Sequence, residues 1–312
     1  MSFKNIVVAG GGVLGSQIAY QTAYCGFSVK VWLRAESSIG RAKPKFERLH
    51  KIYLDTLEAM KTDPSAYARG LADTSDVTEE QIDDLKKKAD DAFNSLVLTT
   101  SYEDAAADAD LVIEAIAENP QEKIAFYTEL QKHLPENTVL VTNTSTLLPS
   151  QLAEYTGRPE KYLALHFANN IWKSNTAEVM GHAGTEQKYY DQVVEFAEQI
   201  RMIPLQLHKE QPGYILNTLL VPFLFAGETL VARGVSDPET VDKTWMLATG
   251  APMGPMRILD VVGLTTAYNI VSMSPDLSDP ESDSAKIAKM LKEKIDAGKT
   301  GINAGEGFYK YK

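Results

Sequence analysis

A glycine-rich turn near the start of the chain is the feature that most limits its possible folds. The apolar run of residues 6–9 leads into Gly10-Gly11-Gly12-Val13-Leu14-Gly15, and apolar residues then follow at helical spacing to residue 24. In such a turn Gly10 permits the tight bend, Gly12 lets a pyrophosphate approach the backbone, and Gly15 lets the helix pack on the strand. Free N–H groups at the helix N-terminus favour phosphates. We therefore predict a dinucleotide site at Gly10, Gly12, Val13, Leu14 and Gly15, with a plain structural turn as the alternative.

The end of the second predicted strand, residues 28–33, bears on which dinucleotide is bound. An acid that holds the ribose 2′-hydroxyl of NAD is expected about 20 residues after the glycines. This chain has Arg34 there, followed by Ser37 and Ser38. A cation and hydroxyls attract a 2′-phosphate, so the pattern favours NADP over NAD. In the alternative interpretation Arg34 stacks on the adenine and either cofactor is accepted, and Glu36 is near enough to substitute for the missing acid.

The bulk composition is that of a soluble globular protein. The 312 residues are 44% hydrophobic and 23% charged, and this length suits two domains of roughly 100–200 residues each. A net charge of −11 disfavours nucleic-acid partners. The single Cys25 cannot form an internal disulfide, and we interpret it as a small buried apolar residue.

The sequence shows no targeting or membrane signal. The N-terminus resembles no targeting signal, and apolar runs such as residues 219–226 are interrupted and shorter than the ~20 residues of a membrane span. We expect a cytoplasmic protein with no membrane partner and no metal site.

The order of predicted elements indicates an α/β fold. Residues 35–92 are charged and helix-prone, which predicts a helical insertion after the second strand. Further strand signals, some separated by helical segments such as residues 123–133, lie at residues 96–98, 111–113, 139–141 and 162–165. Alternating strands and helices favour a parallel sheet with helices on its faces. We predict a Rossmann-type doubly wound sheet with a helical insertion in residues 1–208.

The rest of the chain is predicted to be a smaller all-α domain, residues 209–312. After residues 203–207 no convincing strand follows. Helical patterns lie at residues 214–232, 238–249, 265–273 and 284–297.

A histidine and a glutamate are the candidate catalytic residues. His166 ends an apolar strand, at the edge where open α/β sheets hold their ligands, although a lone histidine is more often structural. Glu178 lies in a second strand-like segment twelve residues later, so the chain can loop out and return. Imidazole can take the hydroxyl proton of an alcohol while hydride leaves the carbon. A carboxylate on the other ring nitrogen fixes the tautomer and stabilises the imidazolium.

Several motifs together give this chain a family resemblance. Besides the glycine loop, they are IEAIAEN (113–119), TNTST (142–146), LHF (165–167), QPGYILN (211–217), PMGP (252–255) and GEGFYKY (305–311). In this order they resemble the L-3-hydroxyacyl-CoA dehydrogenases, an NAD(P)-dependent oxidoreductase family of fatty acid metabolism. Lambda-crystallin-type sugar-acid dehydrogenases and diketoreductases are similar too, so the resemblance does not fix the substrate.

The resemblance implies roles for individual residues. His166 corresponds to the general base and Glu178 to the acid that orients it. Ser145 and Asn217 fall on positions that bind the reacting oxygen or support the active site. Asn169 falls on a polar position of the same cleft, and Glu118 and Lys123 match residues beside the cofactor. Each residue also has a purely structural interpretation. Ser145 could cap a helix, Asn169 and Asn217 could form hydrogen bonds with buried backbone groups, and Lys123 could be a surface charge.

The segment after His166 departs from the family pattern. Relatives continue with prolines and a mostly apolar run, whereas residues 168–175 of this chain are largely polar. Burying an acyl tail against unpaired polar groups would cost about 1–3 kcal/mol each. We therefore predict a short or polar substrate whose carboxylate could pair with Lys173, unless these side chains point into solvent. The helical insertion also lacks the serine and lysine with which relatives bind the CoA portion of the substrate. The basic residues within 41–51 could contact phosphates, but a solvated helix face is the simpler interpretation.

Three functions remain open from the sequence. The favoured one interconverts 3-hydroxyacyl and 3-oxoacyl substrates. A second is a reductase or dehydrogenase of a small free 3-hydroxy acid, sugar acid or diketo ester. The third is a non-catalytic cofactor-binding protein, against which the presence of both His166 and Glu178 argues. By resemblance, residues 209–312 close the substrate cleft and form a homodimer; the apolar residues 219–225 are compatible with this, as they are with an internal core.

Overall fold

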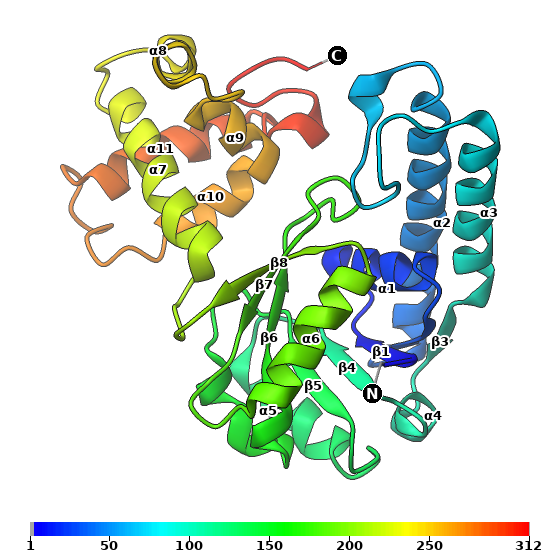
Figure 1. Ribbon diagram of the computed structural model, residues 1–312. Coiled ribbons are helices and arrows are strands. Elements are labelled where there is room, and N and C mark those ends of the chain that lie inside the picture. Colours follow the sequence, from blue (N-terminus) through cyan, green and yellow to red (C-terminus); the bar gives the residue numbers. More distant parts are fainter. Residues whose placement is uncertain (1–2, 312) are drawn as a thin grey trace. The chain divides into compact units, whose positions relative to one another are not determined.

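The computed structural model describes residues 3–311. The chain forms two compact units, Met1–Ile215 and Leu216–Lys312, each with its own core (Figure 1).

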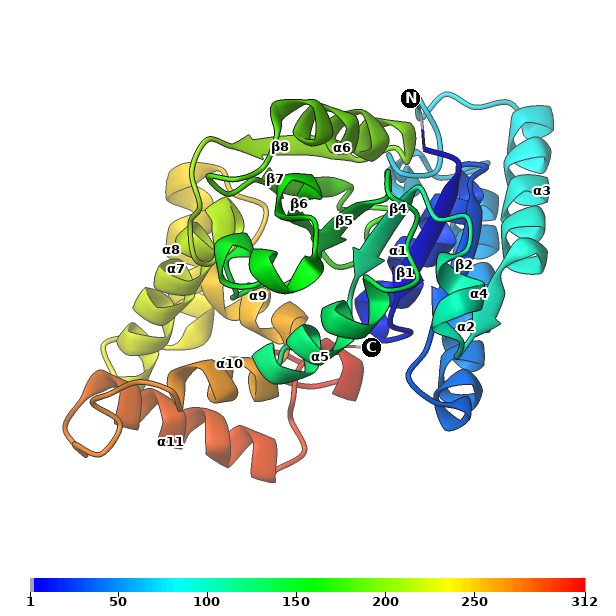
Figure 2. The ribbon, with the colours of Figure 1, turned by 90° about the horizontal axis from the view of Figure 1, so that it is seen from below.

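The first unit is built on one eight-stranded sheet, in the order β3-β2-β1-β4-β5-β6-β7-β8. The strands are β1 Asn5–Ala9, β2 Ser28–Trp32, β3 Val97–Thr99, β4 Leu111–Glu114, β5 Val139–Thr142, β6 Tyr162–Phe167, β7 Thr176–Met180 and β8 Ile203–Leu207. The strands from β3 to β6 are parallel, β7 is antiparallel to β6, and β8 is parallel to β7. Figure 2 shows the strands side by side from β8 to β2. The central strands β4 and β5 are buried on both faces and apolar except for their last residues, Glu114 and Thr142.

Helices cover both faces of this sheet, as the sequence predicted. They are α1 Val13–Tyr24, α2 Glu36–Ala59, α3 Glu79–Ser95, α4 Tyr102–Ala106, α5 Pro120–Leu130 and α6 Gln187–Gln199. The core on one face contains side chains of α1, α2, α3 and α6, and the core on the other face contains side chains of α4 and α5. The unit is therefore a three-layer α/β sandwich.

The predicted helical insertion is the pair α2 and α3, between β2 and β3. α3 begins with a capping box, in which the Thr78 hydroxyl accepts from the Gln81 amide and the Gln81 side chain accepts from the Thr78 amide. Ile82, Leu85 and Ala89 lie on one face of α3 and are buried in the core, so the polar opposite face is solvated.

The second unit is helical. Its helices are α7 Tyr214–Ala232, whose first two residues belong to the first unit, α8 Pro238–Thr249, α9 Pro255–Val262, α10 Leu264–Val271 and α11 Asp283–Asp296. α9 was not among the helices predicted from the sequence. Pro255 is its first residue, a position where proline is favoured. The Asp242 carboxylate accepts from the amides of Met256 and Arg257 in the same turn.

A buried aspartate fixes the C-terminal segment to this helical core. The Asp260 carboxylate accepts from the amides of Phe308 and Tyr309 and from the Tyr311 hydroxyl, at 2.8–2.9 Å. A Cβ on Gly307 would lie 2.0 Å from an Asp260 oxygen, so only glycine allows this close approach.

The predicted boundary after residue 208 falls before the division between the compact units. Tyr214 accounts for this difference, because it is buried with Ala164, Met180 and Leu207 of the first unit. The start of α7 is thus bound to the sheet unit.

α7 has the bounds predicted from the sequence and runs unbroken through Pro222. The apolar run of residues 219–226 looked too short for a membrane span, but the whole helix is long and apolar enough to cross one by length and composition alone. Its most apolar window has a mean hydropathy of 1.7 and is only 17% buried. One such helix is weak evidence for a membrane, because helices of soluble proteins pass the same test.

Candidate active site

His166 and Glu178 face each other on neighbouring strands. β6 and β7 are antiparallel, and their register places His166 directly opposite Glu178. The His166 Nδ1 lies 2.9 Å from the Glu178 Oε2, and both side chains are buried. A carboxylate can only accept, so Nδ1 carries the proton and Nε2 keeps a free lone pair.

The free nitrogen of His166 faces Ser145. The Ser145 hydroxyl, in the turn that follows β5, lies 3.2 Å from Nε2. The geometry therefore places a basic nitrogen and a hydroxyl donor side by side, as proton transfer to or from a substrate oxygen requires.

Tyr214 completes the surroundings of the imidazole. Its ring stacks on His166 with centroids 4.4 Å apart and planes at 17°, and its hydroxyl donates to the Thr144 carbonyl at 2.8 Å. The next residue, Ile215, donates its amide to the second oxygen of Glu178 at 2.8 Å. Tyr214 has a φ of 54°, so the backbone adopts an uncommon conformation to make these contacts. Burial, followed by the nearby Glu118 and Glu178 carboxylates, raises the pKa of Tyr214 and keeps its hydroxyl a donor.

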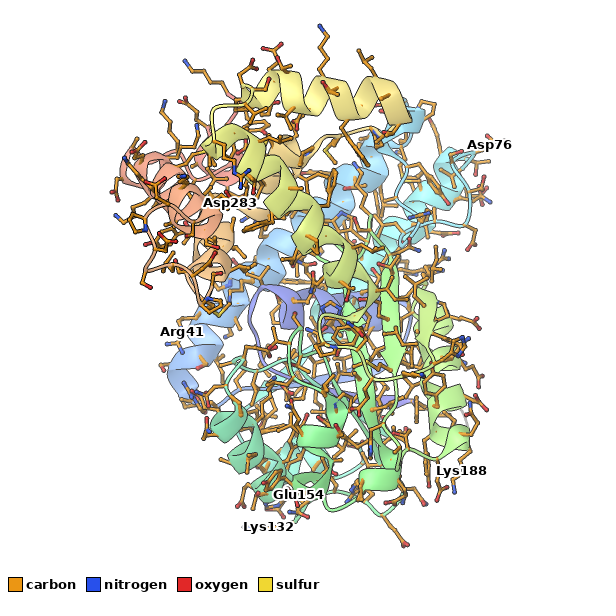
Figure 3. The ribbon with its side chains drawn as sticks, turned by 90° about the vertical axis from the view of Figure 1, so that its left-hand side faces the viewer. Arg41, Asp76, Lys132, Glu154, Lys188 and Asp283 are labelled. Carbon is orange, nitrogen blue, oxygen red and sulfur yellow. The ribbon has the colours of Figure 1, made fainter. Side chains whose placement is uncertain are left out.

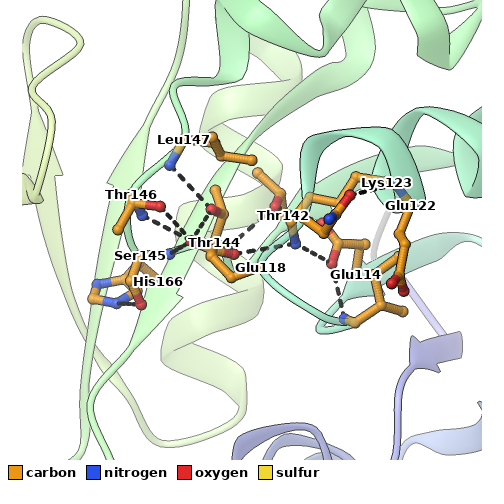
Figure 4. A network of polar contacts seen from close by, with 12 residues as sticks. Glu114, Glu118, Glu122, Lys123, Thr142, Thr144, Ser145, Thr146, Leu147 and His166 are labelled. Atoms are coloured by element: carbon orange, nitrogen blue, oxygen red, sulfur yellow. Dashed lines mark hydrogen bonds and ion pairs between the residues drawn. The ribbon is translucent and has the colours of Figure 1, made fainter. Parts of the chain in front are cut away.

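Glu118 holds the turn that carries Ser145 (Figure 4). One of its oxygens accepts from the hydroxyl of Thr144, the amide of Ser145, and the amide and hydroxyl of Thr146. Burial alone would raise the pKa of Glu118, but these hydrogen bonds and the Lys123 ammonium lower it, which keeps the carboxylate charged. Glu118 therefore positions Ser145 through the backbone.

A buried ion pair lies beneath Glu118. The Lys123 ammonium is 2.6 Å from Glu114 and 3.4 Å from Glu118, and neither Glu114 nor Lys123 has more than 1% of its side chain exposed. Glu114 also accepts from the hydroxyls of Tyr127 and Thr142. The interpretation of Lys123 as a surface charge is therefore wrong, and Glu114 is a site-supporting residue that sequence reasoning missed.

The predicted dinucleotide loop lines a large cavity. The cavity has a volume of about 700 Å³ and is bounded by the glycine loop, the end of β2 and residues that follow β4. Gly10 has a φ of 119°, and a Cβ on Gly15 would lie 2.2 Å from the Gly10 carbonyl oxygen, whereas one on Gly12 would meet nothing within 4 Å. Gly12 thus leaves the open space that a pyrophosphate needs, at the start of α1. Val13 is exposed and Leu14 half-buried in the first turn of that helix.

Three cations line the cavity. Arg34 is 75% exposed and donates to Glu122 at 2.8 Å. Arg41, labelled on the pale blue α2 in Figure 3, donates to Ser38 at 2.7 Å. Lys45 donates to the Gly11 carbonyl at 2.8 Å. The residues present therefore suit a ligand with phosphate groups.

The proposed substitute acid does not line this cavity. Glu36 instead accepts from the Thr100 hydroxyl at 2.9 Å. The acid at the cavity is Glu122, on α5.

Family models cover almost the whole chain. The 3-hydroxyacyl-CoA dehydrogenase NAD-binding domain matches residues 5–211, and the 3-hydroxyacyl-CoA dehydrogenase C-terminal domain matches residues 213–311. The chain belongs to the 3-hydroxyacyl-CoA dehydrogenase family. It is therefore an oxidoreductase with a nicotinamide cofactor.

Relatives of two kinds match over nearly their full length. The human mitochondrial hydroxyacyl-coenzyme A dehydrogenase is 31% identical over 309 residues, which cover 99% of this chain and 91% of the relative. A probable 3-hydroxybutyryl-CoA dehydrogenase of Bacillus subtilis is 29% identical, covering 100% of this chain and 98% of the relative. A solved diketoreductase structure, described as acting on dicarbonyl compounds, is 44% identical with a TM-score of 0.86 and covers 100% of both chains.

The polar segment after His166, residues 168–175, has both exposed and buried side chains. Asn169 and Lys173 are exposed, whereas Trp172 is buried against Tyr53 of the helical insertion. The exposure of Lys173 matches the solvent-facing alternative, and its pairing with a substrate carboxylate stays a prediction. Asn217 lies on α7 in the second unit, so its role at the site also stays a prediction.

Proposed function

We propose that this dehydrogenase interconverts a 3-hydroxy and a 3-oxo group on a short or polar substrate, with His166 as the general acid and base. The observation that carries this proposal is the double pairing of one imidazole, with Nδ1 on Glu178 at 2.9 Å and Nε2 beside Ser145 at 3.2 Å.

In the oxidation direction His166 Nε2 takes the proton of the substrate hydroxyl. Glu178 then lies against a positively charged ring, which it stabilises because the pair is buried and close. In the reduction direction the imidazolium returns this proton to the carbonyl oxygen, toward which the Ser145 hydroxyl also donates. The nicotinamide, when bound, supplies or accepts the hydride. Gly10, Gly12 and Arg34 line the cavity that would hold the dinucleotide, and Gly15 lets α1 pack closely against the Gly10 carbonyl.

NADP is the proposed cofactor over NAD. The cavity beside the end of β2 gathers Arg34, Arg41 and Ser38, which are donors that suit a 2′-phosphate. Glu122 competes for Arg34, so a bound 2′-phosphate would have to displace that ion pair. Steady-state kinetics with NADH and NADPH at 340 nm test this preference, and turnover with NADH alone would refute it.

The substrate class has two candidates. The family models and the human relative favour an acyl-CoA thioester. The 44% identity to the diketoreductase favours a free dicarbonyl compound, such as a diketo ester. Parallel assays with acetoacetyl-CoA, free 3-oxo acids and a diketo ester separate the two. Efficient reduction of long acyl-CoA substrates would contradict the proposal of a short or polar substrate.

A His166→Gln variant tests the catalytic assignment. It should bind cofactor normally but lose about 10²–10⁴-fold in rate, because a general base is removed. Tight cofactor binding by the wild type without turnover of any of these substrates would favour the non-catalytic alternative.

We further propose that the protein is a homodimer through its second unit, in the cytoplasm, with a role in fatty acid metabolism if CoA thioesters are its substrates. The exposed apolar surface of α7 supports the dimer.

A further inference from the structure

The second unit contains a cavity that the proposed chemistry does not use. It has a volume of about 230 Å³ and is walled by apolar side chains of α7, α9 and α10, among them Leu224, Leu259 and Val271. Its rim is formed in part by Phe225, Ile270 and Met273, which are exposed by 37%, 40% and 76%.

A single carboxyl group lies inside this apolar cavity. Glu228 on α7 is only 5% exposed, and its Oε1 has no hydrogen-bond partner among the described residues. Buried carboxyl groups are normally paired, because an unpaired one loses its water without compensation. Glu228 is therefore a group whose surroundings are incomplete in the single chain.

The surroundings of Glu228 contain no opposing charge. Of the cavity-lining residues that the structure describes on α7, α9, α10 and the turn after α10, Glu228 is the only titratable one. Burial accordingly raises the pKa of Glu228 to about 7, with no other cause. Near neutral pH this carboxyl exists in both its neutral and its charged form.

The area around the cavity matches what a second copy would cover. α7 is 19 residues long, and the most apolar part of it is only 17% buried. A helix of this length has on the order of 900 Å² of lateral surface, of which roughly half can face a partner. The exposed apolar side chains of Ile270 and Met273 beside α7 extend this surface toward the about 800 Å² per partner that a stable interface needs. A small molecule could fill the cavity but would leave the apolar rim and α7 in water, whereas a self-complementary interface covers both.

We propose that a second copy of this chain closes the cavity over the neutral Glu228 carboxyl, so that self-association weakens as Glu228 ionises. This inference depends on the homodimer proposed above and adds the group that controls it.

The sign follows from the number of bound protons. Closing the cavity removes the remaining water from Glu228, which disfavours its charged form, so the dimer holds more protons than two separate chains. Association is therefore strongest below pH 7 and is lost as pH rises through 7. With a pKa of about 7 in the free chain and two neutral carboxyls in the dimer, the dissociation constant should rise about 100-fold between pH 6 and pH 8.

Analytical ultracentrifugation of the full chain at pH 6, 7 and 8 tests the inference. The wild type should show this rise, and Glu228→Gln, which is neutral and of the same shape, should remain dimeric with a dissociation constant that is flat across this range. Glu293→Gln is the matched control, because Glu293 is exposed on α11 and its loss should leave the pH dependence intact.

Each contrary outcome has a distinct meaning. A wild-type dimer with a flat dissociation constant, or an unchanged pH dependence in Glu228→Gln, would overturn the role of Glu228 and leave the homodimer standing. A wild type that stays monomeric at all three pH values would overturn the homodimer as well, while turnover at 340 nm reports separately on the enzymatic proposal. A monomer that binds 1-hexanol saturably, or that sediments with phosphatidylcholine vesicles, would assign the cavity to a small amphiphile or to a lipid surface and overturn the proposal.

Discussion

The replacement of Glu178 by glutamine gives the sharpest test of the catalytic pair. The two oxygens of Glu178 have different partners, since one accepts from the Ile215 amide at 2.8 Å and the other faces His166 Nδ1 at 2.9 Å. A glutamine must keep its oxygen toward the Ile215 amide, because an amide N–H there would oppose a fixed donor. Its NH₂ group then faces Nδ1, which can no longer be the protonated nitrogen.

The variant thus forces the wrong tautomer onto His166. The proton moves to Nε2, beside Ser145, and the nitrogen that should take the substrate proton has no lone pair left for it. An equivalent tautomer error in a serine protease triad costs about 10⁴-fold, or about 5.5 kcal/mol of transition-state stabilisation. We expect a loss of this order in kcat.

Stopped-flow and steady-state measurements at 340 nm would give the rate, and a fluorescence titration the cofactor affinity. Glu178→Gln should bind cofactor as the wild type does. Glu198→Gln is the control, because Glu198 is exposed on α6. A decrease in kcat of less than tenfold would refute the reasoning, since it would mean that Glu178 does not set the tautomer.

Five further variants, at four positions, probe the surrounding structure. Gly12→Ala should fold normally but raise the cofactor KM, because its Cβ enters the open space that the pyrophosphate needs. Gly15→Ala should instead lower the Tm, because its Cβ would lie 2.2 Å from the Gly10 carbonyl oxygen. Equal Tm values for the two variants would contradict this reasoning. Lys123→Met should lower the free energy of unfolding by about 3–5 kcal/mol, because Glu114 is left buried without its cation. Thermal melts should show a fall in Tm on the order of 10 °C. An unchanged Tm would show that the ion pair is not needed for stability. Tyr214→Leu should lower kcat about tenfold through loss of a stack worth ~0.5–1.5 kcal/mol, while Tyr214→Phe should keep most of the rate, and similar losses in both would argue against the stack.

Local signals made the fold and the centre of the site predictable. The glycine turn is a short-range pattern whose conformation depends on nearby residues, and the structure builds the expected strand, turn and helix there. The His166–Glu178 geometry depends only on the return of one strand beside its neighbour, over a spacing that a loop can span.

The supporting residues were not predictable, because their roles come from contacts between distant segments. Tyr214 reaches His166 from the start of α7, and Glu114 lies in a strand that looks like ordinary core until Lys123 packs under it. α9 was missed for a related reason, since Asp242 on another helix supplies the acceptors for its first amides. Glu228 gave no signal either, because its burial depends on side chains of α9 and α10.

The clasp of Asp260 on the last residues makes the helical unit intolerant of trimming. Deleting the chain from Phe308 onward would remove all three donors and strand a carboxylate that is 1% exposed within the helical core. Residues 308–311 are therefore required for the stability of the helical unit. Shortened versions of this protein made for expression or crystallisation should keep these residues.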